Sequence, residues 1–368
     1  MNALFTIMER IPDLRQEWKV VHPLKNIVTI VLFALLANAD DWVEIGYFAK
    51  CNKLILKNYL DLSKGVPSHD TIQRVFTCID PKALQHLNDE WAVILEKDEG
   101  EKIKQLLAID GKTSRGSRGK NTEALHTVSA WGKERGICFG QKSMPGKGNE
   151  ITMIKELLDT ISIKDQIVTI DAIGTQTEIA NKIIEKNGDY VLAVKGNQGI
   201  LLEEIKYFFD SAELLAESSY HKTTEKAHGQ IEKREYWQHD DVKWLQKDNR
   251  WAGLKSIGMT RNTNIKDGKE TTETRYFISS LQKEIDVFAS SVRGHWSVES
   301  MHWHLDVTFR EDKNQTREKT GVENLNIMRK LALSMLKNLK FEEKLSIKKK
   351  RFVLSCGFQE HIQKLMEL

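Results

Sequence analysis

Residues 105–117 read QLLAIDGKTSRGS, and this stretch decides how the rest of the chain is interpreted. The run LLAI is short and apolar, which is typical of a buried strand, and Asp110 closes it. Gly111 allows close backbone approach to a ligand, and Lys112 and Arg115 can contact phosphate groups. We therefore expect a strand that ends at an anion-binding edge.

A second apolar run ends in the same way. Residues 166–174 read QIVTIDAIG, with Asp171 directly after IVTI. The chain between the two runs is long enough for a hairpin and a helix, so the two strands can lie parallel. Parallel neighbours would bring Asp110 and Asp171 to the same sheet edge. Clustered carboxylates repel each other unless a cation compensates them.

A third acidic residue lies in a segment with helical period, HWSVESMHWHLD at 295–306. At 100° per residue, one polar stripe holds His295, Glu299, His302 and Asp306. If the helix continues, the same stripe gains Arg310, Lys313 and Arg317. Two strand-end carboxylates and a helical one predict an oxygen-ligand site for Mg²⁺ or Mn²⁺. Glu311 is a competing third ligand, but it is rotated about 120° from Glu299.

Apolar periodicity predicts the remaining elements. The first hundred residues are predicted to be helical, with helices at 24–37, at 42–50 and after Pro67, the last capped by Ser68 or Asp70. A hairpin is predicted from ALHTVSAWG and GICFGQKSM, with a turn near 133–136. Further helices are predicted at 150–161, 176–186, 286–294, 296–309 and 324–339, and a strand at YVLAVKG. Three strands between 199 and 283 could pair into a small sheet.

Composition limits the class of protein. The chain has 368 residues, which is room for two or three domains, and 40% of its residues are hydrophobic. Its four cysteines lie far apart, so a reducing cytosol is expected. The longest apolar run, 27–37, is too short to span a membrane. Residues 111–147 hold eight basic against two acidic residues, and residues 313–351 hold twelve against four, which favours binding of a polyanion.

The motifs together resemble the DDE transposases of bacterial insertion sequences, most closely the H-repeat-associated family linked to Rhs elements. The resemblance is carried by DLRQEWKVVHPL, GVPSHDTIQRVFTCIDP, AIDGKTSRGS, TIDAIGTQTEIA, DYVLAVKGNQG and RGHWSVESMHWHLDVTFRED, in this order. It implies an α/β fold with an RNase H-like catalytic core and a β-rich insertion, preceded by a small all-helical domain. The expected domains are a helical domain at 1–95, a catalytic domain at 103–340 with its insertion at 199–283, and a basic, amphipathic tail at 341–368. The helix after Pro67 is a candidate for reading DNA ends like a helix-turn-helix, and the alternative is that it only packs onto the next domain.

The resemblance also implies an activity and a site. The activity is metal-dependent cleavage of DNA at the ends of a mobile element, followed by strand transfer into target DNA. The catalytic and metal-binding acids are Asp110, Asp171 and Glu299, which hold two Mg²⁺ or Mn²⁺ ions. The implied partner is double-stranded DNA, bound by a homodimer. The protein is expected in the bacterial cytoplasm, associated with the nucleoid and not with a membrane. Residues expected to contact DNA are Lys112, Arg115, Lys195, Arg310 and Arg317.

One part of the family pattern differs in this chain. Related transposases often carry Tyr seven residues before, Arg four before and Lys seven after the glutamate. Those positions hold Val292, His295 and Asp306 here. His295 and His302 are therefore candidates for an auxiliary role beside Glu299. Two alternatives remain open: a non-mobile nuclease or resolvase with the same site, and a DNA-binding protein that no longer cuts.

Overall fold

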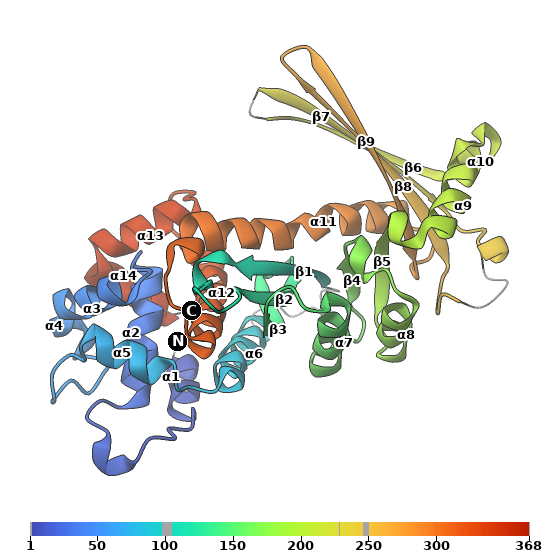
Figure 1. Cartoon of the computed structure of the whole chain (residues 1–368). Helices are drawn as coiled ribbons and strands as arrows, with labels where there is room; N and C mark the ends of the chain where they lie inside the picture. The colour runs from blue at the N-terminus through green and yellow to red at the C-terminus, as the bar shows by residue number, and fades with distance from the viewer. Residues whose placement is uncertain (1, 98–104, 228, 246–249, 368) are drawn as a thin grey trace. The chain divides into compact units, whose positions relative to one another are not determined.

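The computed structural model describes residues 2–97, 105–227, 229–245 and 250–367 (Figure 1). It is a mixed α/β structure whose contacts divide the chain into two compact units. Unit 1 contains Met1–Lys102, Gly111–Gly148 and Glu299–Leu368, and unit 2 contains Ile103–Asp110 and Asn149–Val298. The domain boundaries expected from the sequence remain a prediction, because this division follows contacts alone.

The sheet of unit 2 is built around three parallel strands. These are β1 (Leu106–Ser114), β4 (Ile167–Ile170) and β5 (Asp189–Val194). Ile109 pairs with Ile170, and Ile170 pairs with Leu192, so these residues of the three strands lie side by side, and β1 continues past them to Ser114. The strand order is β1-β4-β5-β9-β8-β7-β6, and the last residues of β1, from Gly111, belong to unit 1. The short apolar runs therefore lie in buried strands, as predicted, but the expectation that Asp110 ends its strand is wrong, because β1 continues to Ser114.

The segment after β5 contains the three predicted strands, which pair with one another and also join the central sheet. It begins with two helices, α9 (Gly199–Asp210) and α10 (Ala212–Glu217). Four strands follow: β6 (Ser219–Ala227), β7 (Gln230–His239), β8 (Ser256–Lys266) and β9 (Lys269–Ser279). β9 pairs antiparallel with β5, so these strands extend the central sheet. The reason is that β5 needs a hydrogen-bonding partner on its second edge.

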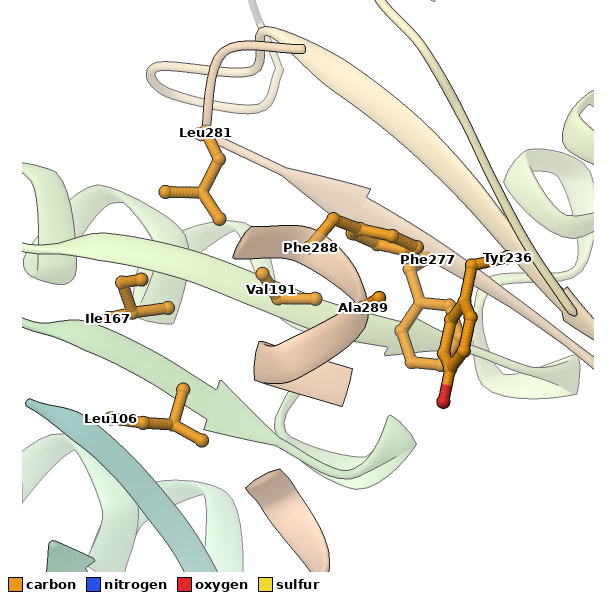
Figure 2. Close-up of a cluster of buried hydrophobic side chains, with 8 residues drawn as sticks. All are labelled: Leu106, Ile167, Val191, Tyr236, Phe277, Leu281, Phe288 and Ala289. Carbon is orange, nitrogen blue, oxygen red and sulfur yellow. The ribbon is translucent and has the colours of Figure 1, made fainter. Parts of the chain in front are cut away.

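A hydrophobic core joins the sheet of unit 2 to helix α11 (Ile285–Trp303). Leu106, Ile167 and Val191 come from the three parallel strands, and Phe288 comes from α11 (Figure 2). Helices α7 (Glu150–Thr160) and α8 (Thr177–Glu185) lie on the opposite face of β4 and β5 (Figure 1). Both faces of the parallel strands are thus covered, which explains why their sequences are apolar throughout rather than alternating.

Helix α11 is continuous, so the prediction of separate helices at 286–294 and 296–309 is wrong. Gly294 does not interrupt it, since one glycine inside a helix costs only about 1 kcal/mol relative to alanine. After Trp303 the chain forms a π-helical turn, His304–Thr308, and Arg310 adopts a left-handed conformation with φ of 50°. The polar stripe therefore stops before Arg310, and neither Lys313 nor Arg317 continues it.

Unit 1 is organised around helix α12 (Lys319–Asn338), whose residues are almost all buried. It packs against α2 (Leu24–Leu36), α6 (Pro81–Lys97) and β3 (Ile137–Pro145), which forms the predicted hairpin with β2 (Leu125–Gly132). The other helices are α1 (Asn2–Glu9), α3 (Trp42–Cys51), α4 (Lys53–Leu56), α5 (His69–Phe76), α13 (Ile347–Cys356) and α14 (Phe358–Glu367). No helix among the described residues combines the length and apolar character that a membrane span requires.

One buried carboxylate connects the first and last segments of unit 1. Asp40, which is 3% exposed, lies between α2 and α3. Its Oδ1 accepts a hydrogen bond from Arg351 Nη2 at 2.6 Å, and its Oδ2 accepts one from Arg310 Nε at 2.8 Å. Arg351 is fully buried and also donates to the carbonyl oxygen of Leu35. The C-terminal helices are therefore tied to the N-terminal helices through ionic hydrogen bonds.

We expect Asp40→Ala to lower the free energy of unfolding by about 3–5 kcal/mol, because it leaves the buried Arg351 guanidinium without its counter-ion. Urea unfolding monitored by circular dichroism measures the change. The control is Glu203→Ala, which removes an exposed ion pair with Lys206. That change should cost at most about 1 kcal/mol. Equal losses for the two variants would contradict the role assigned to Asp40.

Candidate active site

Asp110 and Asp171 lie close together in the backbone of unit 2, because each comes directly after a residue of one strand pair. Each directly follows one member of the Ile109–Ile170 pair in the parallel β1–β4 ladder. Both side chains are half-buried. The structure therefore brings these two predicted acids to the same level of two neighbouring strands. Asp171 directly follows the end of β4, whereas Asp110 lies within β1, which continues to Ser114.

The turn that follows β4 fixes the backbone around Asp171. The carboxylate accepts a hydrogen bond from the backbone N–H of Ile173 at 3.1 Å and caps the short helical turn Ala172–Gly174. The loop after β5 holds this turn from the side. Asn197 Nδ2 donates to the carbonyl of Ala172 at 2.6 Å, and Gln198 Nε2 donates to the carbonyl of Thr175 at 3.0 Å.

Asn197 and Gln198 were not predicted as site residues. The available signal was their position in the sequence. They follow the strand YVLAV in the stretch KGNQG, one strand over from Asp171. Amide side chains at the end of a parallel strand can reach the loop of the adjacent strand, and here they do.

The electrostatics of Asp171 reflect its surroundings. Burial raises the pKa of the Asp171 carboxyl above its ordinary value, and the negative charge of Glu150 raises it further. The Ile173 N–H and the positive charge of Lys195 act in the opposite direction, and the pKa remains raised. Such a carboxylate is stabilised by an added cation, since positive charge nearby favours its ionised form.

His295 lies on α11 in unit 2 and contacts the strand that carries Asp171. Its Nδ1 lies 3.1 Å from Thr169 Oγ1 on β4. Burial, together with the charge of Arg275, lowers the pKa of His295 to about 4. The imidazole is therefore neutral at pH 7. The structure therefore favours His295 as a neutral hydrogen-bonding group over a cation that offsets negative charge.

Glu299 follows His295 by one helical turn on α11 and is exposed. It is the first residue of the last segment of unit 1. His302 is half-buried in the final α-helical turn, before the chain becomes π-helical at His304. His295, Glu299 and His302 thus share one continuous helix, as predicted.

Glu311, the competing third ligand, is engaged within unit 1. It is 2% exposed, and its carboxylate receives Lys112 Nζ at 2.8 Å and Asn326 Nδ2 at 2.7 Å. Arg329 lies 3.6 Å away. Burial alone would raise the pKa of Glu311, but Lys112 and Arg329 lower it to about 2. Its oxygens are therefore committed to internal partners.

The residues predicted to contact DNA occupy different environments. Lys112 is only 9% exposed and pairs with Glu311 and Asp306. Arg310 pairs with Asp40 and Glu44. The side chains of Arg115, Lys195 and Arg317 are exposed. These last three are the most exposed of the five, since Lys112 is buried and Arg310 is engaged in ion pairs.

The two aspartates of unit 2 suit a hard cation by their donor chemistry, because carboxylate oxygens are the ligands that Mg²⁺ and Mn²⁺ prefer. The raised pKa of Asp171 fits the same interpretation. Within the described ranges, however, no group of three or more His, Cys, Asp and Glu side chains is arranged to hold a metal ion.

Comparison with known families decides the identity of the chain. Residues 101–335 match the model of the transposase DDE domain, and residues 5–92 match the DDE_Tnp_1-associated model. The chain belongs to the DDE transposase family. This confirms the resemblance seen in its motifs, and members of this family generally use divalent metal ions.

Several proteins of Escherichia coli are similar to this chain over most of its length. One is the "Putative transposase YncI" of strain O157:H7, 36% identical, with 100% of this chain and 96% of the relative covered. Another is the "H repeat-associated putative transposase YhhI" of strain K12, 36% identical, with 92% and 91% covered. The "Putative protein YbfL" of the same strain is 37% identical, with 92% and 91% covered.

The lowered pKa of His295 predicts a pH dependence of stability. Between about pH 6.5, the value in the unfolded chain, and about pH 4, the unfolded state binds more protons. The contribution of His295 to the free energy of unfolding is therefore complete above this pH window and is lost as the pH falls through it. We expect His295→Asn, which keeps a polar atom near Thr169 but cannot titrate, to lose less stability between pH 7 and pH 5 than the parent.

Urea unfolding at the two pH values measures this difference. Ser290→Asn is the control, because Ser290 is an exposed residue on the same helix that does not titrate, so its replacement should leave the pH dependence of the parent unchanged. His304 is present in every variant, so its own contribution cancels. An identical loss of stability in the parent and in His295→Asn would contradict the assignment.

Proposed function

We propose that this transposase cleaves DNA at the ends of a mobile element and joins the cleaved ends to target DNA. The observation that carries the proposal is the pair of aspartates that follow matched positions on β1 and β4. Membership of the DDE transposase family supports it, since an activity assigned by fold alone would be analogy.

We further propose that the central strands form an RNase H-like core. The antiparallel hairpin of β2 and β3, the parallel strands β1, β4 and β5, and the helices flanking β4 and β5 are consistent with this assignment. The segment 199–283 then corresponds to the β-rich insertion, and β9 attaches it to the core through β5.

Asp110, Asp171 and Glu299 are the proposed catalytic acids, and together they would hold one or two Mg²⁺ or Mn²⁺ ions. The metal would supply a nucleophile at neutral pH and neutralise charge that develops on the phosphate. The contribution of the protein is to hold the acids in place. The turn at Ala172–Gly174 and its contacts from Asn197 and Gln198 do this for Asp171.

The proposed reaction has two steps. In the first, the oxygen of a water molecule attacks the phosphorus at the element end. The 3′ oxygen leaves with a proton, so the products are a 3′-hydroxyl and a 5′-phosphate. In the second, that 3′-hydroxyl attacks a phosphodiester of target DNA, a target 3′ oxygen leaves, and one phosphodiester bond replaces another.

DNA phosphates are proposed to contact Lys195, Arg115 and Arg317, because these side chains are exposed. Lys195 is the best supported of the three, since it follows β5 and its charge acts on Asp171. Recognition of the element ends is proposed for the helical segment 1–95, most of which the DDE_Tnp_1-associated model matches, with a homodimer on the paired ends.

An assay with a labelled element end and a target plasmid tests the proposal. Cleavage followed by covalent joining to the plasmid is the expected result. Cleavage without joining would indicate a nuclease or resolvase instead. Binding to the end without either reaction, with Mg²⁺ and Mn²⁺ each tested in excess, would indicate a DNA-binding protein that no longer cuts.

We expect Asp110→Ala, Asp171→Ala and Glu299→Gln each to lower the cleavage rate by on the order of a thousandfold, because several kcal/mol of metal-ion catalysis is lost. Binding to the end should persist, and the circular dichroism spectrum should match the parent. Glu204→Gln is the control, since this carboxylate lies on α9 in the insertion. An Asp171→Ala protein that cleaves at the parental rate in metal excess would exclude the assignment.

The turn at Asp171 yields a second expectation. Asn197→Ala removes the hydrogen bond to Ala172, and we expect it to slow cleavage at saturating DNA by about 10–100-fold, since small displacements of a catalytic group are costly. Gly199→Ala is the matched control two residues further on, at the start of α9, because a Cβ added there would meet no atom within 4 Å. It should cleave at the parental rate, and equal rates for both variants would remove Asn197 from the site.

A further inference from the structure

Lys112 occupies an internal position that the proposed function does not explain. Its ammonium group lies 2.8 Å from Glu311 Oε2 and 2.7 Å from Asp306 Oδ1, with Asp312 Oδ1 3.7 Å away. Burial alone would lower the pKa of Lys112, but Glu311 and Asp306 raise it above its ordinary value. The ammonium is thus charged and surrounded by carboxylates, with little of its surface left for another anion.

These contacts join two segments that are far apart in sequence but belong to the same unit. Lys112 lies on the end of β1, two residues after Asp110. Its partners lie on the chain that leaves α11, the helix that carries Glu299. The same segments also meet through another hydrogen bond, because the Arg115 backbone N–H donates to the Asp312 side chain at Oδ1, at 2.9 Å. A Cβ built on Gly116 would lie only 2.3 Å from the carbonyl oxygen of Asn314.

The partner segment has an irregular backbone that this contact supports. Asp306 lies in the π-helical turn, and the left-handed Arg310 directs the chain back so that Glu311 is buried. Both conformations are uncommon, and such strained segments persist where the surroundings hold them, often at functional sites. Here two ionic contacts hold this segment: Lys112 binds Glu311, and Asp40 binds Arg310.

We propose that Lys112 and Glu311 form an ionic latch that positions Glu299 for the reaction, rather than Lys112 contacting DNA. The inference rests on the proposed function for its catalytic consequence. Lys112 is a positioning residue, because it acts through the end of the Glu299 helix. Loss of the latch would leave that helix end, and with it the carboxylate of Glu299, in a range of positions.

Lys112→Met tests the latch, because methionine is of similar length and carries no charge. We expect cleavage at saturating DNA to fall about 100-fold, while the dissociation constant for DNA and its salt dependence stay parental. Lys195→Met is the comparison. Lys195 is exposed and proposed to contact phosphate, so its loss should weaken DNA binding and lower the salt slope of binding by about one. A Lys112→Met protein that binds weakly with a reduced slope, yet cleaves at the parental rate at saturation, would overturn the proposal.

Glu311→Gln and the double variant provide a thermodynamic cycle. If the two residues act through one contact, cleavage by the double variant should be close to that of the slower single variant. Multiplied losses would mean that they act independently and would contradict the latch. Should Lys112→Met fail to fold, Asp306→Asn takes its place, because that carboxylate is 38% exposed and its loss should be tolerated. A smaller reduction in cleavage with unchanged DNA binding is expected there, and no reduction would count against the latch.

Hydrogen–deuterium exchange separates failure of the latch from failure of the proposed function, because it requires no DNA chemistry. We expect the amides of residues 304–314 to exchange at least tenfold faster in Lys112→Met than in the parent, while those of β4 stay unchanged. Asp171→Asn should leave residues 304–314 at the parental rate. Faster exchange in Lys112→Met, combined with a parent protein that does not cleave DNA, would retain the latch and reject the proposed function. Parental exchange in Lys112→Met would reject the latch itself.

Discussion

A buried carboxylate needs positive charge around it. In unit 1 this requirement brings together segments that are far apart in the sequence. Glu311 and Asp40 are both almost inaccessible to water. Lys112 and Arg329 surround the first, and Arg310 and Arg351 bind the second. Breaking such a pair by removing one partner is far more costly than breaking a surface pair, so these contacts restrict which segments can move independently.

The sequence was most informative where structure is local. The runs that precede Asp110 and Asp171 are short and apolar, so their strand character and parallel pairing could be predicted. The hairpin of β2 and β3 and the cap of α5 at Ser68 follow from equally local patterns. In each case the residues that determine the element are neighbours in the chain.

The predictions that depended on distant partners were less complete. A basic residue after a strand-end aspartate suggests phosphate binding, and nothing near Lys112 reveals that its partner Glu311 lies 199 positions later. Periodicity likewise continued the polar stripe past Thr308, because it cannot register the π-helical turn or the left-handed Arg310. Asn197 was missed because its role depends on the turn of the adjacent strand.

The pairing of Lys112 with the chain around Asp306 and Glu311 also restricts how relatives can exchange sequence. The two segments lie in the first and last thirds of the reading frame, so a crossover between them would combine a strand from one parent with a helix end from another. Where the parents differ at these positions, the hybrid would contain a buried charge without its counter-ion. Recombination among such elements should therefore favour breakpoints that leave both segments with one parent.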